Sequence, residues 1–385
     1  MMQFQFTTAG QIIFGNGKHR EIGDLAASCG SKALFVTGSG GAGPEKITSL
    51  LDEKKIKWST FQIKGEPTVE LILEGVDFAR QNSCDFVIAF GGGSVLDGGK
   101  AISAMLTNPG NLLDYLEVVG KNQPLQHRAA PMIAIPTTAG TGTEVTRNAV
   151  LAVTEKRVKV SLRSALILPA VAIIDPELTC SMPPAVTASS GMDALTQVIE
   201  PFVSHRANAM TDLFAREGIM RAGRSLLDAY LDGNNMRARE DMAWVSLLGG
   251  LCLANAGLGA AHGFAGPIGG MFDAPHGAIC ARLLPIVTAV NVKALRQREP
   301  QNPALQRYLD VSKMVTNDQV ASIDEGVSWL KKICDDLHIP PLSQYGISQS
   351  DIPEIVEKSK VSSSMKGNPL QLTVDELTNI MMQAI

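Results

Sequence analysis

The sequence predicts a doubly wound α/β domain in residues 1–180, followed by an all-helical domain in residues 181–385. Two observations lead to this prediction. In the first half, short apolar runs alternate with helical patterns, which is typical of parallel βαβ units. From Ala185 onward the pattern is helical, with almost no strand signal. A chain of 385 residues is also long enough to form a hydrophobic core in each domain.

Short apolar runs predict the strands of the first domain. These runs are residues 33–37, 86–90, 132–135 and 171–174. Residues 69–82 have the pattern of an intervening helix, and residues 150–161 predict a β-hairpin that turns at 154–157.

Glycine-rich loops follow two of the predicted strands. The loop at residues 91–94 (GGGS) opens a helix that contains Asp97 and Lys100. Glycines let backbone N–H groups approach phosphate oxygens, and a helix N-terminus adds positive potential. We therefore take this loop as the better candidate for binding a pyrophosphate. Residues 38–43 contain a GxGxxG pattern, but that pattern alone is also typical of a flexible strand-to-helix turn.

Long amphipathic stretches at residues 212–231 and 241–256 predict helices in the second half. The run 243–261 contains no charged residue and is nearly long enough to span a membrane. It also contains four glycines and Asn255, which favours a helix packed closely against other helices inside the protein.

Composition excludes some classes of partner. The net charge is −4 and no basic block occurs, so nucleic acid is not expected to bind. The six cysteines are scattered without a CxxC pair, as in proteins of a reducing compartment. The first residues, MMQFQFTTAG, have no signal-peptide pattern. We expect a cytoplasmic protein, a homodimer without a membrane partner.

Histidines and one buried acid point to a metal. His262 and His276 lie in the glycine-rich run 260–277, where two imidazoles joined by a turn-rich loop could converge on one cation. Asp193 lies in an apolar helix start, where a carboxylate needs a cation or hydrogen-bond donors. Together they could form a 2-His-1-carboxylate site for Zn²⁺ or Fe²⁺. The alternative is that each histidine is an ordinary, partly buried side chain.

These motifs resemble those of the iron-containing (group III) alcohol dehydrogenases. The matching segments are GMDAL at 191–195, HG at 262–263, PHG at 275–277 and LLP at 283–285. Two positions depart from the family pattern: Gln197 replaces a metal-ligating histidine, and Gly266 replaces a histidine that lies near the nicotinamide. The resemblance covers essentially the whole chain. It implies a Rossmann-like domain and a helical domain, as in dehydroquinate synthase, with the active site in the cleft between them.

The resemblance also implies roles for individual residues. The metal ligands would be Asp193, Gln197, His262 and His276, of which Asp193, His262 and His276 are also the catalytic candidates. The cofactor-binding candidates would be Gly38, Ser39 and Gly40 at the adenosine ribose, Gly91, Gly92, Gly93, Ser94 and Asp97 at the pyrophosphate, Thr137, Thr138 and Thr143 at the nicotinamide, and Lys159 at a ribose.

The expected cofactors are a nicotinamide dinucleotide and a divalent metal. The resemblance implies that Gly38 stands where family members that prefer NAD place an acid to bind the ribose 2′-hydroxyl, so we expect NADP(H), with NAD as the alternative. The metal would be Fe²⁺ or Zn²⁺, bound more weakly because an amide oxygen at Gln197 is a poorer donor than imidazole.

The expected activity is the interconversion of a small alcohol and its aldehyde or ketone, with the metal polarising the substrate oxygen. One alternative is a metal-independent NAD(P)H reductase of the same fold, resembling maleylacetate reductase. Another is a cofactor-binding protein with vestigial catalysis. Dehydroquinate synthase and glycerol dehydrogenase share the broader fold, so the fold alone excludes neither a lyase nor a polyol substrate.

Overall fold

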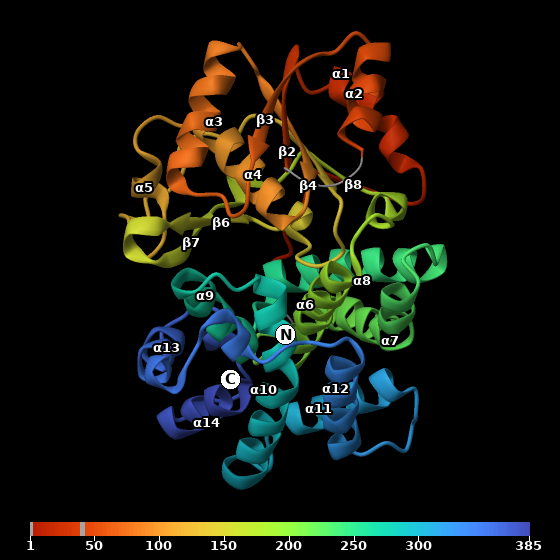
Figure 1. The fold of residues 1–385 in the computed structure, drawn as a ribbon, viewed down its shortest axis with the longest axis vertical. Helices are drawn as coiled ribbons and strands as arrows, with labels where there is room; N and C mark the ends of the chain where they lie inside the picture. The colour runs from red at the N-terminus through yellow and green to blue at the C-terminus, as the bar shows by residue number, and fades with distance from the viewer. Residues whose placement is uncertain (1–2, 39–42) are drawn as a thin grey trace. The chain divides into compact units, whose positions relative to one another are not determined.

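The computed structural model describes residues 3–38 and 43–385 (Figure 1). They form two compact units. The α/β unit is Thr7–Thr138 with Gly142–Met182, and the helical unit is Pro183–Ile385 with Ala139–Thr141 and the N-terminal residues up to Phe6. The domain boundary expected from the sequence was at residue 180, and the long C-terminal part of the helical unit begins at Pro183.

A six-stranded parallel sheet forms the centre of the α/β unit, with the strand order β1-β8-β5-β4-β2-β3. The strands are β1 (Gln11–Phe14), β2 (Lys32–Gly38), β3 (Lys57–Ile63), β4 (Phe86–Gly91), β5 (Met132–Pro136) and β8 (Val171–Ile174). The four strands predicted from apolar runs are confirmed. The sequence did not predict β1 and β3, which are the two edge strands and are largely half-exposed.

Helices cover both faces of this sheet. They are α1 (Ile22–Ala27), α2 (Pro44–Glu53), α3 (Val69–Gln81), α4 (Gly93–Thr107) and α5 (Leu112–Tyr115). Successive residues of a strand point to opposite faces. In β2, Leu34 and Val36 share a core with apolar residues of α3 and α4, whereas Phe35 belongs to the core with α1 and α2. The doubly wound prediction is therefore confirmed.

A separate antiparallel hairpin joins β6 (Asn148–Val153) to β7 (Val158–Arg163), as the sequence predicted. Short 3₁₀ helices occur at Lys18–Glu21, Thr143–Val145, Thr154–Lys156, Ala165–Ile167, Pro176–Thr179, Leu342–Tyr345, Gln349–Asp351 and Met365–Gly367.

The helical unit contains α-helices and short 3₁₀ turns over its described residues, which confirms the all-helical prediction. The helices are α6 (Pro184–Val203), α7 (Ala209–Leu231), α8 (Met236–Ala256), α9 (Ala260–Met271), α10 (His276–Arg298), α11 (Ala304–Thr316), α12 (Ile323–Asp336), α13 (Ile352–Lys360) and α14 (Val374–Ala384). Helix α6 is buried from Gly191 to Val203, and α7, α8 and α10 pack against it. Its side chains are therefore held rigidly.

One sequence expectation about this unit is wrong. The sequence predicts a turn-rich loop between His262 and His276, but residues 260–271 are helical and α10 begins at His276. The glycines permit close packing rather than turns. A Cβ on Gly263 would lie 2.8 Å from the Met365 side chain, so this glycine lets Met365 pack directly against α9.

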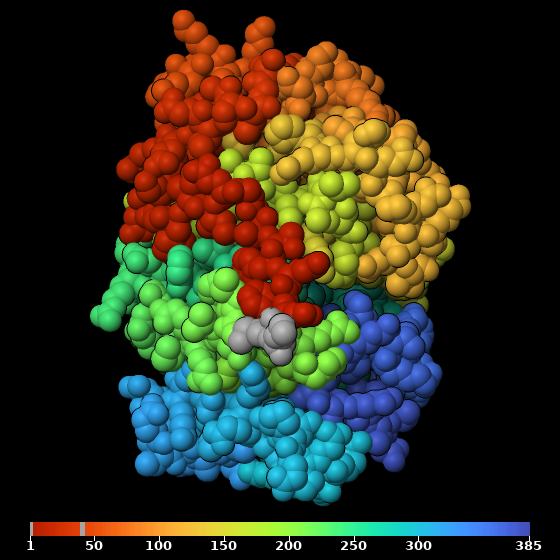
Figure 2. Space-filling model, turned by 180° about the vertical axis from the view of Figure 1, so that it is seen from behind, coloured from red at the N-terminus to blue at the C-terminus, as the bar shows by residue number. Residues whose placement is uncertain are grey.

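Helix α10 is long and apolar enough to cross a membrane, but 83% of its apolar window is buried inside the protein. It packs against α6, α9, α11, α12 and α14, and Figure 2 shows α11 and α12 (light blue) at the surface of this unit. The uncharged run 243–261 is divided between α8 and α9, which bend by 97° at the break. Both segments are core helices of the unit.

Candidate metal centre and nucleotide-binding loops

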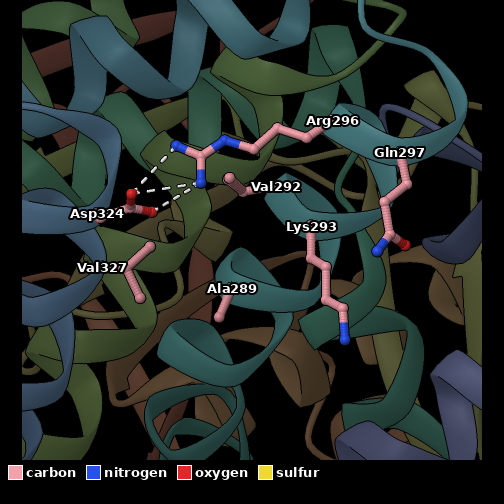
Figure 3. Close-up of a pocket in the computed structure, with 7 residues that line it drawn as sticks. All are labelled: Ala289, Val292, Lys293, Arg296, Gln297, Asp324 and Val327. Atoms are coloured by element: carbon pink, nitrogen blue, oxygen red, sulfur yellow. Dashed lines mark hydrogen bonds and ion pairs between the residues drawn. The ribbon is translucent and has the colours of Figure 1, made fainter.

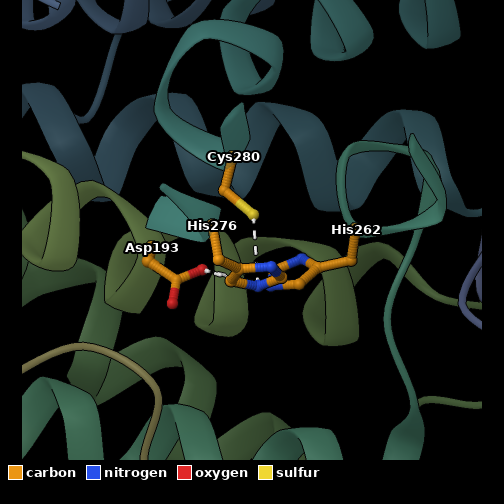
Figure 4. A group of neighbouring side chains, drawn as sticks. All are labelled: Asp193, His262, His276 and Cys280. Carbon is orange, nitrogen blue, oxygen red and sulfur yellow. Dashed lines mark hydrogen bonds and ion pairs between the residues drawn. The ribbon is translucent and has the colours of Figure 1, made fainter. Parts of the chain in front are cut away.

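Four ligand-type side chains meet in the helical unit (Figure 4). Asp193 comes from α6, His262 from α9, and His276 and Cys280 from the first turns of α10. One ligand atom of each lies within 4.8 Å of those of the other three. Asp193 Oδ1 is 3.2 Å from His262 Nε2 and 3.8 Å from His276 Nε2. The structure thus brings together the three residues predicted as catalytic, and it adds Cys280, which the sequence reasoning missed.

Gln197 lies beside Asp193, one helical turn later on α6. Its Nε2 donates to Asp193 Oδ2 and to the carbonyl oxygen of Gly140, both at 3.2 Å. Residues 193 and 197, four apart, therefore lie on the same face of α6. In this geometry the amide nitrogen is turned towards the carboxylate and holds it in place.

Glu200 supports the cluster from the next turn of α6, and the sequence reasoning assigned it no role. Its carboxylate accepts the backbone N–H groups of Gly259 (2.9 Å) and Ala261 (2.6 Å) and lies 2.8 Å from His262 Nδ1. A carboxylate at a helix N-terminus is favourable because it satisfies N–H groups that have no partner within the helix. When His262 is neutral and donates from Nδ1 to Glu200, its lone pair is on Nε2, which faces Asp193.

Three of the four side chains of the cluster are buried and the fourth is partly exposed. Asp193, His262 and Cys280 are buried, whereas the His276 side chain is 38% exposed. His276 is therefore the member of the cluster that solvent reaches.

The electrostatics of the cluster favour a positive charge at its centre. Burial raises the pKa of Asp193, but the charges of the neighbouring His276 and His262 rings outweigh burial and leave that pKa below its usual value. Burial lowers the pKa of His262, but neighbouring Cys280, Asp193 and Glu200 reverse the effect and raise it well above normal. Burial raises the pKa of the Cys280 thiol to about 12.

Buried polar atoms without partners test whether these residues fit a metal. Within the described ranges, six buried side-chain atoms have no hydrogen-bond partner. Two of them belong to this cluster, Asp193 Oδ1 and His262 Nε2, and a third is Gln197 Oε1 beside it. A buried polar atom without a partner costs roughly 1–3 kcal/mol. Carboxylate, imidazole and thiol together suit a divalent metal such as Zn²⁺ or Fe²⁺. The residues present therefore fit a divalent cation.

The predicted pyrophosphate loop lies at the carboxyl edge of the sheet. Strand β4 ends at Gly91, and α4 begins at Gly93 without a side-chain cap within the described chain. A Cβ on Gly92 would lie 3.4 Å from the Thr138 side chain, so the glycine leaves room for a ligand to approach the backbone. An uncapped N-terminus of a 15-residue helix, with Ser94 in its first turn, is a suitable place for a phosphate group.

Neighbouring strands bring further candidates to this edge. Thr37 pairs with Phe90 between β2 and β4, so Gly38 at the end of β2 lies next to Gly91. Thr137 N donates to Gly91 O at 3.0 Å, which places Thr137 and Thr138 on the other side of β4. Strands β2 and β4 are neighbours in the sheet, and the chain leaves them in opposite directions: β3 lies on the far side of β2, and β5 lies on the far side of β4. Ligands bind at such switch points in parallel sheets. The candidates Ser39 and Gly40 lie outside the described residues.

Three other candidates are engaged within the protein. Thr143 Oγ1 donates to Asp97 Oδ1, and Asp97 Oδ2 accepts the N–H of Val150. Buried Lys100 pairs with Asp97 at 3.0 Å and donates to both oxygens of Thr143. This network fixes α4 to the β6–β7 hairpin. Lys159, on β7, pairs with Glu66 at 2.9 Å.

Two further features of the described residues belong to neither site. A surface hollow between α10 and α12 is lined by Lys293, Arg296 and Asp324, among others, and Arg296 is paired with Asp324 at 2.9 Å (Figure 3). A second group of ligand-type side chains consists of His19, Asp175 and Glu177. There Asp175 accepts the N–H groups of Gly17, His19 and Glu177 and is paired with the His19 ring, so it stabilises a turn.

Comparison with known proteins gives consistent results over the whole chain. Residues 9–176 match the family described as iron-containing alcohol dehydrogenase, and residues 187–385 match its C-terminal part. A choline dehydrogenase of Bacillus subtilis (strain 168) is 35% identical over 94% of this chain and 90% of its own length. A 1,3-propanediol dehydrogenase of Klebsiella pneumoniae is 34% identical over 99% and 98%. A crystal structure of 1,3-propanediol oxidoreductase matches with a TM-score of 0.91 and 32% identity over 100% of both chains. Some relatives are named for NADPH and others for NAD.

Proposed function

Because the chain belongs to the iron-containing alcohol dehydrogenase family, we propose that it interconverts a small alcohol with its aldehyde or ketone by means of NADP(H) and a divalent cation at Asp193, His262 and His276. The protein is an NAD(P)-dependent oxidoreductase that acts on CH–OH groups. The cofactor preference, the ligand residues and the roles given below are the proposal.

The observation that carries the metal part is the group of buried atoms without partners. Asp193 Oδ1 and His262 Nε2 are 3.2 Å apart, and neither has a hydrogen-bond partner among the residues that the structure describes. Each can donate an electron pair to one ion, and Nε2 does so once the ring of His262 has released its second proton. A cation held there would supply Lewis-acid polarisation of the substrate oxygen and would stabilise alkoxide character at neutral pH.

The side chains around the cluster prepare it for this chemistry. Glu200 keeps the proton of His262 on Nδ1, so that Nε2 stays available as a ligand. Gln197 holds Asp193 Oδ2 by a hydrogen bond and leaves Oδ1 free. His276, the exposed member, borders the path by which substrate arrives. The nicotinamide supplies or accepts the hydride, and the deep burial of Asp193 and His262 excludes water from the metal side.

Roles in the α/β unit follow from the carboxyl edge of the sheet. We assign phosphate binding to residues 91–94 and the approach to the ribose to Gly38. Thr137 and Thr138 flank the same edge, as the register of β4 and β5 supports. Asp97, Thr143 and Lys159 are paired inside the protein, so we assign them to supporting the loops rather than to contacting the cofactor. The preference for NADP(H) rests on Gly38, because a carboxylate there would repel a 2′-phosphate.

Metal analysis and activity assays test the proposal. Protein purified without chelators should contain one divalent ion per chain, and it should reduce members of a panel of aldehydes and ketones with NADPH at least as well as with NADH. His262→Ala and Asp193→Ala should each lose both metal and turnover, because too few ligands remain.

Full metal content and activity in either variant would place the metal elsewhere. Activity of wild-type protein after complete metal removal would favour the metal-independent reductase. Failure with every carbonyl compound, despite tight NADPH binding, would favour vestigial catalysis. A cytoplasmic location and a homodimer remain predictions, and sedimentation analysis tests the second.

A further inference from the structure

Cys280 occupies a ligand position that the proposed function does not use. It lies one helical turn after His276 on α10 and is fully buried. Its Sγ is 3.7 Å from His276 Nε2, and this sulfur lies within 4.8 Å of the ligand atoms of Asp193 and His262. Figure 4 shows the Cys280 side chain pointing to the same space as the two imidazoles and the carboxylate. A buried cysteine needs no polar partner, so this convergence does not follow from packing alone.

The amide group of Gln197, in contrast, is used in hydrogen bonds that hold Asp193 in place. Its Nε2 donates to Asp193 Oδ2 and to Gly140 O, and both of these atoms can only accept hydrogen bonds when Asp193 is ionised. Rotating the amide by 180° would bring Gln197 Oε1 against two acceptors and remove both hydrogen bonds. The neighbouring atoms therefore fix the orientation in which nitrogen faces the carboxylate.

These two observations assign the fourth protein ligand. We propose that Cys280 binds the cation as a thiolate together with Asp193, His262 and His276, that Gln197 is a positioning residue for Asp193, and that the resulting site selects Zn²⁺. This inference rests on the metal site of the proposed function and deepens it. When the ion binds, the thiol proton leaves to solvent and no group is oxidised or reduced.

The chemistry of the donor set favours this selectivity. A thiolate is a softer donor than a carboxylate or an imidazole, and it prefers Zn²⁺ to Mg²⁺, Mn²⁺ or Fe²⁺. Two neutral imidazoles, one carboxylate and one thiolate carry two negative charges, which neutralise a divalent ion. The side-chain oxygen of a glutamine would add neither charge nor softness.

Cobalt substitution tests the assignment directly. Metal is removed from the full-length protein, and its cysteines are kept reduced with a phosphine under anaerobic conditions. The protein is then titrated with Co²⁺ while its absorption spectrum is recorded. A thiolate ligand gives an intense sulfur-to-cobalt charge-transfer band in the near ultraviolet, which oxygen and nitrogen ligands do not give. The titration is repeated with Cys280→Ser, Cys280→Ala and, as the matched control, Cys84→Ser. Cys84 is a buried cysteine of the α/β unit that donates to Ala33 O.

Wild type and Cys84→Ser should show the charge-transfer band, and both Cys280 variants should lose it while keeping weaker visible bands of bound cobalt. In competition with a chelator, the Cys280 variants should bind Zn²⁺ at least about tenfold more weakly. Circular dichroism checks that each variant is folded. If a variant does not fold, the absorption spectrum of the cobalt-loaded wild type still shows whether a thiolate binds the metal.

Two results would overturn the assignment. If wild type binds cobalt without a charge-transfer band, and His262→Ala abolishes the visible bands, the metal site of the proposed function stands but Cys280 is not a ligand. If wild type binds neither Co²⁺ nor Zn²⁺, both this inference and the metal part of the proposed function fail.

Discussion

Glu200 supports the proposed metal site from α6, and Glu200→Gln tests that support. The substitution keeps the size of the side chain but replaces one carboxylate oxygen by an NH₂ group. In wild type the two oxygens accept from Gly259 N, Ala261 N and His262 Nδ1. An amide accepts hydrogen bonds through its oxygen only, so at least one of these three N–H groups must face the NH₂ group of the new glutamine, which cannot accept a hydrogen bond.

The magnitude follows from the lost contacts. Hydrogen bonds to a charged group are worth about 1.5–3 kcal/mol each, so losing one and weakening a second should reduce the free energy of unfolding by about 2–4 kcal/mol. The metal affinity should fall as well, because His262 loses the partner that fixes its tautomer. Changes in such supporting residues typically weaken metal binding by about ten- to a hundredfold.

The assay is a chelator competition for Zn²⁺ with wild type and variant side by side, together with urea unfolding of both metal-free proteins. Glu217→Gln is a suitable control, since Glu217 is a partly exposed glutamate whose pairing partner, Arg221, lies on its own helix α7. A Glu200→Gln protein with wild-type zinc affinity would refute the reasoning, because it would show that His262 needs no second partner to bind the metal.

The remaining predictions concern single positions in both units. Gly38→Asp should weaken NADPH binding at least about tenfold, and NADH binding less, because a carboxylate repels the 2′-phosphate; equal losses in fluorescence titrations would contradict this. Burial raises the pKa of Glu144 from 4.5 to about 7, so ionisation of this side chain lowers the stability of the wild-type protein as the pH rises from 4.5 through 7. Relative to wild type, Glu144→Gln should therefore become more stable over that range, by up to about 3 kcal/mol at pH 8. A stability difference that does not change with pH in their melting curves would contradict this. Among the described residues, nothing lies within 4 Å of a Cβ built on Gly266 in α9; Gly266→Ala should therefore stabilise the protein by about 0.5–1 kcal/mol in thermal unfolding, and a loss of stability would show that the space is filled.

The sequence predicted the interior of the sheet better than its edges. Central strands such as β4 are buried on both faces, so they read as continuous apolar runs. The edge strand β3 carries Lys57, Ser59 and Gln62, and all of its residues except Ile63 are half-exposed or exposed, so its composition resembles that of a loop. The start of α7 was placed at residue 212 instead of 209, because hydrophobic periodicity does not record the Asn208 cap.

Prediction of the metal centre was limited by one error in secondary structure. A turn-rich loop between His262 and His276 gives no reason to start a helix at His276, so the helical relation between His276 and Cys280, four residues apart, is missed. Glu200 was within reach of sequence reasoning. Positions 193, 197 and 200 are spaced for one helical face, and a glutamate on that face of a buried helix needs donors. The partners of Glu200, at the start of α9, come from a distant part of the sequence.

The helical unit also includes residues Ala139–Thr141, which lie in the sequence between segments of the α/β unit. Gly140, within Ala139–Thr141, accepts a hydrogen bond from Gln197, and a Cβ at Gly140 would lie 2.8 Å from Ser190. A chimaera made by exchanging gene segments between homologous enzymes at residue 182 would therefore inherit Gly140 from one parent and α6 from the other. Any recombination design should carry codons 139–141 together with those of the C-terminal half, or confine the exchange to parents with glycine at that position.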